Sequence, residues 1–148
     1  MAHFAKISEG NEVLTVLFIE DKYLQDENGV EQESIGQAYL ETHNNWPAHL
    51  WIQTSYNTGS NQHKNGGTPF RGNYAGVGMK WYPEHGVFMG AKPYALWVYD
   101  SSIACWQSPI GNCPELTQEQ LDETIANGNP VYRYDWNEPN QTWDLVTL

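Results

Sequence analysis

The run Val13-Leu14-Thr15-Val16-Leu17-Phe18-Ile19 decides the fold class of this chain. Every residue in it except Thr15 is apolar, and most are β-branched or aromatic types that favour strands. Because the run is almost continuously apolar, we expect it to lie in the centre of a sheet. The preceding segment alternates, and Ser8-Glu9-Gly10-Asn11 has the chemistry of a turn. The sequence therefore predicts a β-hairpin from Phe4 to Ile19.

A helix, a strand and a long loop are expected after this hairpin. Apolar side chains recur at helical spacing from Glu31 to Thr42, which predicts a short amphipathic helix ended by Trp46-Pro47. The segment from Leu50 to Tyr56 predicts a strand. Residues 57–73 consist mostly of Gly, Asn, Ser and Thr, and they make a long loop for a compact domain. We therefore expect this loop to be exposed, functional or held by a neighbouring molecule.

Three later segments repeat one pattern of aromatic residues around a polar turn. In each, a Tyr is followed directly by Pro or Asp, then by a turn and a returning aromatic residue, which predicts cross-strand packing in a hairpin. A small hairpin cannot bury one face by itself, so these hairpins are expected to stack on one another or on a partner. The three segments are Met79–Met89, Leu96–Trp106 and Val131–Val146.

A second helix is predicted between the last two hairpins, from Gln118 to Ala126. Thr117 and Gln120 have the spacing of a capping box, and Gly128 offers a C-terminal stop. The expected fold is thus mainly β, of the α+β class. It is a single domain of residues 1–148, antiparallel and hairpin-rich, with one or two short helices. Residues 1–78 would form an N-terminal hairpin, helix and strand unit, and residues 79–148 the aromatic hairpins with the inserted helix.

The composition excludes several classes of function. The chain has 148 residues with 7 basic and 18 acidic side chains, for a net charge of −11. A nucleic-acid binder needs cations to displace phosphate counterions, and a protein of anionic membrane surfaces needs them too. No apolar run is long enough for a membrane span, and the first residues lack the pattern of a secretory signal, so we expect neither feature. With 7 Trp and 9 Tyr, the chain is expected to fold around an aromatic core.

The sequence contains no recognisable catalytic or metal-binding motif. The five histidines form no H-E-x-x-H pair, and no G-x-S-x-G nucleophile motif occurs. An EF-hand aligned on Gly29 would place apolar Leu24 and Ile35 at ligand positions. We therefore expect no enzyme activity, no cofactor and no metal ion. Cys105 and Cys113 flank a turn that could bring them within bridging distance, and both a disulfide and two free thiols remain open.

Three ordered motifs resemble one family of small acidic proteins that tailed phages of cyanobacteria and other aquatic bacteria encode. The motifs are the opening Met1–Ile7, the segment Trp51–Asn57 and the run Arg71–Gly78. The sequence departs from the family pattern at residues 60–70, which are longer than usual, and at the inserted helix. The resemblance implies a structural protein of the virion, made in the host cytoplasm, with no catalytic residues to carry over.

The expected function is that of a capsid decoration or cement protein on the particle exterior. Its partners would be the major capsid protein and sibling copies, or tail proteins, with no nucleic acid and no membrane. Aromatic residues are enriched at such interfaces, although exposed Trp and Tyr rings can also stack on sugars. The alternative is therefore a tail or fibre component that binds host-surface glycans. The interface candidates are Lys64, Phe70, Arg71, Tyr74, Trp81, Tyr82, Trp97, Tyr134 and Trp136.

Overall fold

A computed structural model describes residues 1–148 as two α-helices and eleven strands in small sheets, each strand pairing within a sheet of two or three. The predicted β-rich α+β class is confirmed. The chain divides into two compact units. Unit 1 comprises Met1–Ala91 and Asp100–Cys105, and unit 2 comprises Lys92–Tyr99 and Trp106–Leu148.

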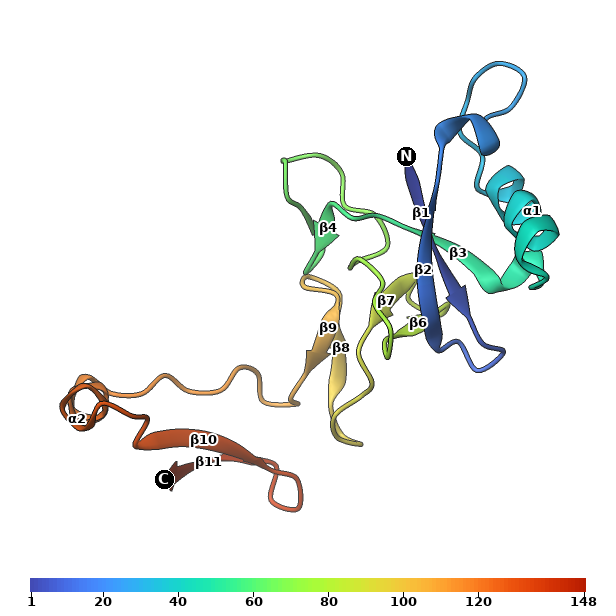
Figure 1. Cartoon of the computed structure of the whole chain (residues 1–148). Coiled ribbons are helices and arrows are strands. Elements are labelled where there is room, and N and C mark those ends of the chain that lie inside the picture. The colour runs from blue at the N-terminus through green and yellow to red at the C-terminus, as the bar shows by residue number, and fades with distance from the viewer. The chain divides into compact units, whose positions relative to one another are not determined.

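All three predicted aromatic hairpins are present, as β6 (Lys80–Tyr82) with β7 (Val87–Met89), β8 (Val98–Asp100) with β9 (Cys105–Gln107), and β10 (Tyr132–Asn137) with β11 (Thr142–Thr147) (Figure 1). Unit 1 contains β1 (Ala2–Ile7), β2 (Val13–Ile19), α1 (Glu33–Asn44), β3 (Trp51–Thr54), β4 (Thr58–Gly59), β5 (Gln62–His63), β6 (Lys80–Tyr82), β7 (Val87–Met89) and the short 3-10 helices Asp21–Tyr23 and Ala48–Leu50. Unit 2 contains α2 (Gln118–Asn127), β10 (Tyr132–Asn137) and β11 (Thr142–Thr147). The hairpin of β8 (Val98–Asp100) and β9 (Cys105–Gln107) has residues in both units.

The main sheet of unit 1 has the strand order β2-β1-β3, so the apolar run of β2 lies at an edge and not in the centre as expected. The central strand is β1, in which His3 pairs with Phe18 of β2 on one side and with Thr54 of β3 on the other. On β2 the Phe18 side chain is 63% exposed. An apolar run marks a strand with both faces partly covered, but it does not say whether both edges are paired.

Helix α1 covers one face of this sheet (Figure 1). Phe4 of β1 lies fully buried in a cluster with Leu24, Leu40 and Trp51. Gly36 permits this close approach, since a Cβ at that position would lie 2.6 Å from Cζ of Phe4. The helix begins and ends two residues later than predicted, and it stops where Asn45 takes a left-handed conformation.

The opposite face of the sheet packs against the β6–β7 hairpin. Ala5, Ile7 and Val13 form a buried cluster with Phe88 of β7, and Trp81 of β6 packs against it. This hairpin therefore belongs to unit 1, although we expected a division after residue 78. The difference arises because the hairpin buries its aromatic face on the sheet of unit 1.

We expected the loop of residues 57–73 to be exposed, functional or held by a neighbouring molecule, and hydrogen bonds within the chain hold it in place. Thr58 is buried, its backbone oxygen accepts the N–H of Tyr74 at 2.7 Å, and its Oγ1 accepts the N–H of Phe70 at 3.0 Å. These bonds fold the loop back on its own start around β4 and β5. Composition cannot reveal these bonds, because they join groups that are distant in sequence.

In unit 2 the predicted helix and its capping box are confirmed. Thr117 Oγ1 accepts the N–H of Gln120, whose side chain in turn accepts the N–H of Thr117. Gly128 ends the helix with a φ of 76°. The apolar residues of α2 are not buried, however, and the Ile125 side chain is 76% exposed. Neither α1 nor α2 has the length and apolar character that a membrane crossing requires.

The expected aromatic core is only partly present. Among the 16 Trp and Tyr residues, only Trp51 and Trp136 are buried, and the remaining core consists mainly of aliphatic residues with Phe4 and Phe88. Large rings with a polar atom are seldom buried completely. The other Trp and Tyr side chains are therefore partly or fully exposed at the surface.

Candidate functional site

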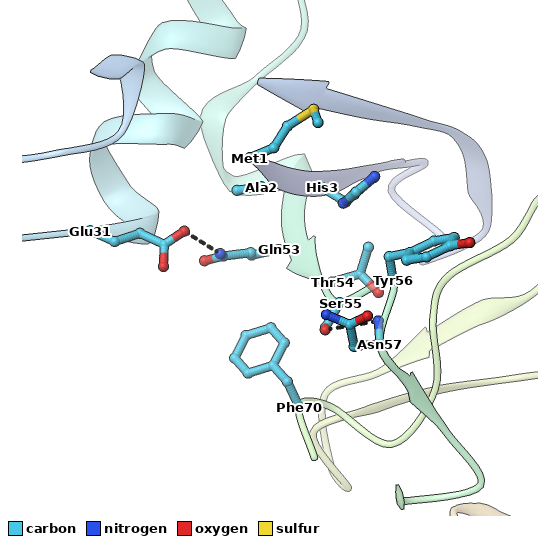
Figure 2. Close-up of a pocket in the computed structure, with 10 residues that line it drawn as sticks. All are labelled: Met1, Ala2, His3, Glu31, Gln53, Thr54, Ser55, Tyr56, Asn57 and Phe70. Atoms are coloured by element: carbon cyan, nitrogen blue, oxygen red, sulfur yellow. Dashed lines mark hydrogen bonds between the residues drawn. The ribbon is translucent and has the colours of Figure 1, made fainter. Parts of the chain in front are cut away.

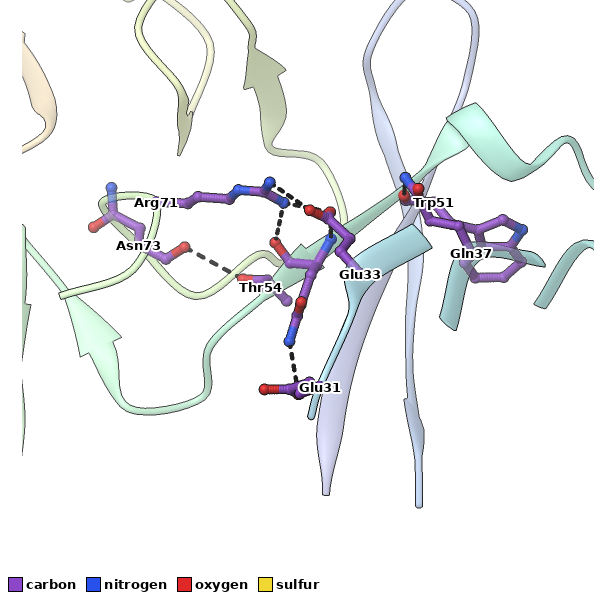
Figure 3. A network of polar contacts seen from close by, with 8 residues as sticks. Glu31, Glu33, Gln37, Trp51, Thr54, Arg71 and Asn73 are labelled. Atoms are coloured by element: carbon purple, nitrogen blue, oxygen red, sulfur yellow. Dashed lines mark hydrogen bonds and ion pairs between the residues drawn. The ribbon is translucent and has the colours of Figure 1, made fainter. Parts of the chain in front are cut away.

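Arg71, expected to be an interface cation, is instead part of a network that closes the outer edge of β3 (Figure 3). Its Nη1 and Nη2 donate to the two carboxylate oxygens of Glu33 at 2.6 and 2.7 Å, and Nη1 also donates to the Gln53 backbone oxygen at 2.9 Å. The Gln53 N–H donates to Glu33 Oε1 at 2.9 Å. The charge of Arg71 is thus satisfied within unit 1.

Trp81 and Tyr82, two further interface candidates, make contacts inside unit 1. The Trp81 ring packs on Phe88 with centroids 4.8 Å apart, and the Arg71 guanidinium carbon lies 5.2 Å from the Trp81 ring centroid. The Tyr82 hydroxyl donates to the backbone oxygen of Gly90 at 3.2 Å. Both side chains are half-buried, so each presents only part of its ring to a partner.

A cluster of rings brings together residues from four segments of unit 1. His3 stacks with Tyr56 at a centroid distance of 6.0 Å, and the Tyr56 and Tyr74 rings form a T-shaped pair with centroids 5.6 Å apart. The Lys64 ammonium lies 3.6 Å from the Tyr56 ring centroid, close enough for a cation–π interaction. Burial lowers the pKa of His3 below its ordinary value, because desolvation disfavours the charged ring. Tyr56 itself is exposed, and these neighbours hold its ring in place.

Beside this cluster is a cavity of about 480 Å³ (Figure 2). It lies where the end of β3 and the residues after it meet the start of β1 and the Glu31 segment. Its wall combines rings, amides, a hydroxyl and a carboxylate, and Phe70 contributes a half-buried ring. The lining residues that carry these groups are His3, Glu31, Gln53, Ser55, Tyr56, Asn57 and Phe70.

In unit 2 three tryptophans pack edge to face. The ring centroids of Trp136 and Trp143 are 5.2 Å apart, and Trp97 lies 5.9 Å from Trp136 and 6.0 Å from Trp143. Trp136 and Trp143 form a cross-strand pair of the β10–β11 hairpin, and Tyr134 lies on the same face two residues before Trp136. With Tyr94, these rings line an open cavity of about 510 Å³.

Two of the predicted interface residues in unit 2 therefore differ in exposure. Trp136 is only 9% exposed and stabilises the hairpin rather than offering its ring to a partner. Trp97 is half-buried, and its indole N–H is buried without a hydrogen-bond acceptor. Buried donors of this kind are rare, and water or a bound group usually satisfies them.

Cys105 and Cys113 are both free and exposed, so no disulfide joins them in this structure. No three His, Cys, Asp or Glu side chains lie close enough together to hold a metal ion.

Sequence reasoning did not single out most of the residues that line the unit 1 cavity. His3, Gln53, Tyr56 and Asn57 lie within the motifs that carry the family resemblance, but no spacing rule connects them. Phe70 and Lys64 were among the interface candidates. The structure places Phe70 in the wall of this cavity and Lys64 over the Tyr56 ring. Comparison with protein families, with curated proteins and with solved structures found no match to the chain.

Proposed function

We propose that this protein is a non-enzymatic structural protein of a phage particle, a decoration protein that docks on the capsid exterior through unit 2. The proposed partners are the major capsid protein and sibling copies of the chain. The single observation that carries the proposal is the small number of buried residues in unit 2. A segment with so little core is expected to bury its apolar surface when it assembles with a partner.

Unit 2 has almost no hydrophobic core of its own. Both buried hydrophobic clusters are built from unit 1 residues, whereas Trp136 and Ser108 are the only buried residues in unit 2. Small folds need a buried core, a disulfide or a partner to be stable. Cys113 is the only cysteine of unit 2 and is free, and a partner would supply the stabilisation that a core or a disulfide gives other small folds.

The surface of unit 2 has the composition of a docking surface. The aromatic face of its hairpin continues into Leu145, which is 43% exposed. Apolar and aromatic groups of this kind gain free energy when a partner removes them from water. The other large hydrophobic side chains exposed in unit 2 are Tyr94, Leu96, Val98, Ile110, Leu121, Ile125 and Leu148.

The charge of unit 2 narrows the choice of partner. Lys92 and Arg133 are the only basic residues of unit 2, which also contains seven Asp and Glu residues and is therefore acidic. Like charges repel, so free copies stay apart in solution until they meet a surface that is neutral or basic. A capsid exterior that presents an apolar groove with basic side chains at its rim fits unit 2 best.

The test is binding of the purified chain to emptied capsids of the phage that encodes it. Decoration predicts saturable co-sedimentation and regular density on the capsid in electron micrographs. A double variant, Ile125→Ser with Leu145→Ser, removes exposed apolar groups from unit 2 and is expected to lower occupancy. Val77→Ser is the matched control, because Val77 is similarly exposed but belongs to unit 1.

Two results would contradict the proposal. One is full occupancy by the double variant, which would show that unit 2 is not the docking surface. The other is density confined to the tail of the native particle, which would favour a tail or fibre component.

A further inference from the structure

We infer that the unit 1 cavity beside Tyr56 is a binding site for a neutral saccharide. The site belongs to unit 1, and it therefore goes beyond the docking function proposed for unit 2. Its volume of about 480 Å³ is within the range of small-molecule sites, which combine apolar walls with a few polar groups.

The cavity offers both hydrogen-bond donors and acceptors that the chain leaves unused. The Asn57 side-chain amide has no partner within the protein and can donate and accept. Ser55 Oγ accepts the Asn57 N–H at 3.2 Å, which leaves its hydroxyl proton free to donate. A sugar hydroxyl both donates and accepts hydrogen bonds, and the Asn57 amide and the Ser55 hydroxyl can meet both needs.

The acceptors lie on the opposite side of the cavity (Figure 2). Gln53 Nε2 donates to Glu31 Oε1 at 3.1 Å, so this bond orients the amide and leaves its oxygen as an acceptor for a ligand. The second carboxylate oxygen of Glu31 is a further acceptor. The Glu33–Arg71 network holds the Gln53 backbone, so the polar wall is prepared before a ligand arrives.

Two aromatic side chains supply the apolar part of the site. The Arg71 guanidinium carbon lies 4.8 Å from the Phe70 ring centroid, which holds the ring against unit 1. The half-buried Phe70 ring lines the cavity and offers an apolar surface for the C–H groups of a pyranose. Tyr56 forms the other wall, held by the stacked His3 ring and by Lys64.

Charge makes an anionic ligand a poor fit. No Lys or Arg side chain lines the cavity, and the Glu31 carboxylate does. The chain as a whole carries a net charge of −11. The Met1 α-ammonium at the cavity is paired with Asp21, so a phosphate or carboxylate ligand would meet the Glu31 carboxylate without a free cation in the lining to offset it. A neutral polyhydroxylated ligand, in contrast, gains hydrogen bonds from every polar group named here.

The inference is tested on the isolated full-length chain by titration with soluble sugars. The probes are glucose, galactose, mannose and N-acetylglucosamine, followed by linear tetrasaccharides of any that bind. The readout is the movement of the Asn57 and Gln53 side-chain amide signals in NMR spectra. Saturable movement with at least one sugar is expected. Tighter binding of a tetrasaccharide identifies a polysaccharide chain as the source, and equal binding identifies a single terminal sugar.

Three variants locate the binding. Asn57→Ala is expected to weaken the affinity about tenfold, and Phe70→Leu, which keeps an apolar side chain without the ring, about fivefold. Asn65→Ala is the control, because Asn65 is an exposed amide in the same loop that does not line the cavity. Thermal unfolding of each variant checks that unit 1 remains folded.

The inference is wrong if no sugar moves the Asn57 or Gln53 signals. It is also wrong if inorganic phosphate moves them and the sugars do not, or if Asn57→Ala binds sugar as tightly as the parent chain. Because no capsid is present in the titration, none of these results depends on the docking function.

Discussion

Arg71 and Glu33, 38 positions apart in the sequence, form a two-pronged ion pair whose side chains are only 24% and 28% exposed. The pair joins the start of α1 to the loop after β5 and also binds both backbone groups of Gln53. No strand pairs with the outer edge of β3, and these two charged side chains form hydrogen bonds there with the Gln53 backbone, as a neighbouring strand would. They protect an edge that would otherwise be open to another chain.

Breaking this pair is expected to destabilise the chain measurably. Arg71→Ala should lower the free energy of unfolding by about 2–3 kcal/mol, because the Glu33 carboxylate and the Gln53 oxygen would lose their charged donor in a half-buried site. Urea denaturation followed by circular dichroism measures the loss. The control is Glu20→Gln, which breaks the exposed Lys22–Glu20 pair and should cost much less, because solvent screens that pair. Equal losses in the two variants would contradict this account.

Gly72 is expected to tolerate no side chain. It has a φ of 76°, and a Cβ there would lie 2.7 Å from Cβ of Ala104 and 2.9 Å from Cβ of Val87. Gly86 has a similar φ of 66° but nothing within 4 Å of the added atom. Gly86→Ala should therefore cost about 1–2 kcal/mol from backbone strain alone, and Gly72→Ala about 1–3 kcal/mol more from the clash. Thermal unfolding of the two variants gives the comparison, and similar midpoints would show that the loop shifts freely.

Two tryptophans are expected to differ in their contribution to stability. Trp51 is fully buried, and its Nε1 donates to the Trp46 backbone oxygen at 3.1 Å, so Trp51→Ala should cost about 3–5 kcal/mol. Trp143 is half-buried, and Trp143→Ala should cost no more than about 2 kcal/mol. The unfolding free energies from urea denaturation check both values. A loss for Trp143→Ala as large as that for Trp51→Ala would show that unit 2 has a core after all.

The stability of the chain is expected to fall in mildly acidic solution through His3. Burial holds the folded-state pKa of His3 below its ordinary value, so the unfolded chain takes up this proton at a higher pH than the folded chain. The contribution of neutral His3 is complete above the unfolded pKa of about 6.5 and declines as the pH falls towards the folded pKa.

The variant His3→Gln cannot titrate and is expected to remove this part of the pH dependence. Thermal midpoints at about pH 7.5 and about pH 5.5 should differ less in the variant than in the parent chain. The other four histidines are present in both proteins and cancel in the comparison. If the thermal midpoint changes equally between the two pH values in the parent chain and in His3→Gln, His3 does not contribute to the pH dependence.

Much of the fold could be predicted from local sequence. The turn residues between the strands placed the hairpins, and the Thr117–Gln120 capping box with Gly128 placed α2. These signals work because the groups that satisfy one another lie within a few residues. The candidate site was much less predictable. Arg71 was predicted only as an interface candidate, since its partner Glu33 is remote in sequence and no local pattern links them.

The sequence by itself determined the β-rich class, the hairpins, the two helices and the acidic charge of this protein. These properties depend on periodicity, turn chemistry and composition, which are local or additive. Only the tertiary structure decided that β2 lies at an edge, that Trp51 is buried while Trp143 is half-exposed, and that Phe70 meets Gln53 and Asn57 at one cavity. Which face of each element is buried, and against what, depends on contacts between distant segments, and the free energy of those contacts is not encoded at any single position.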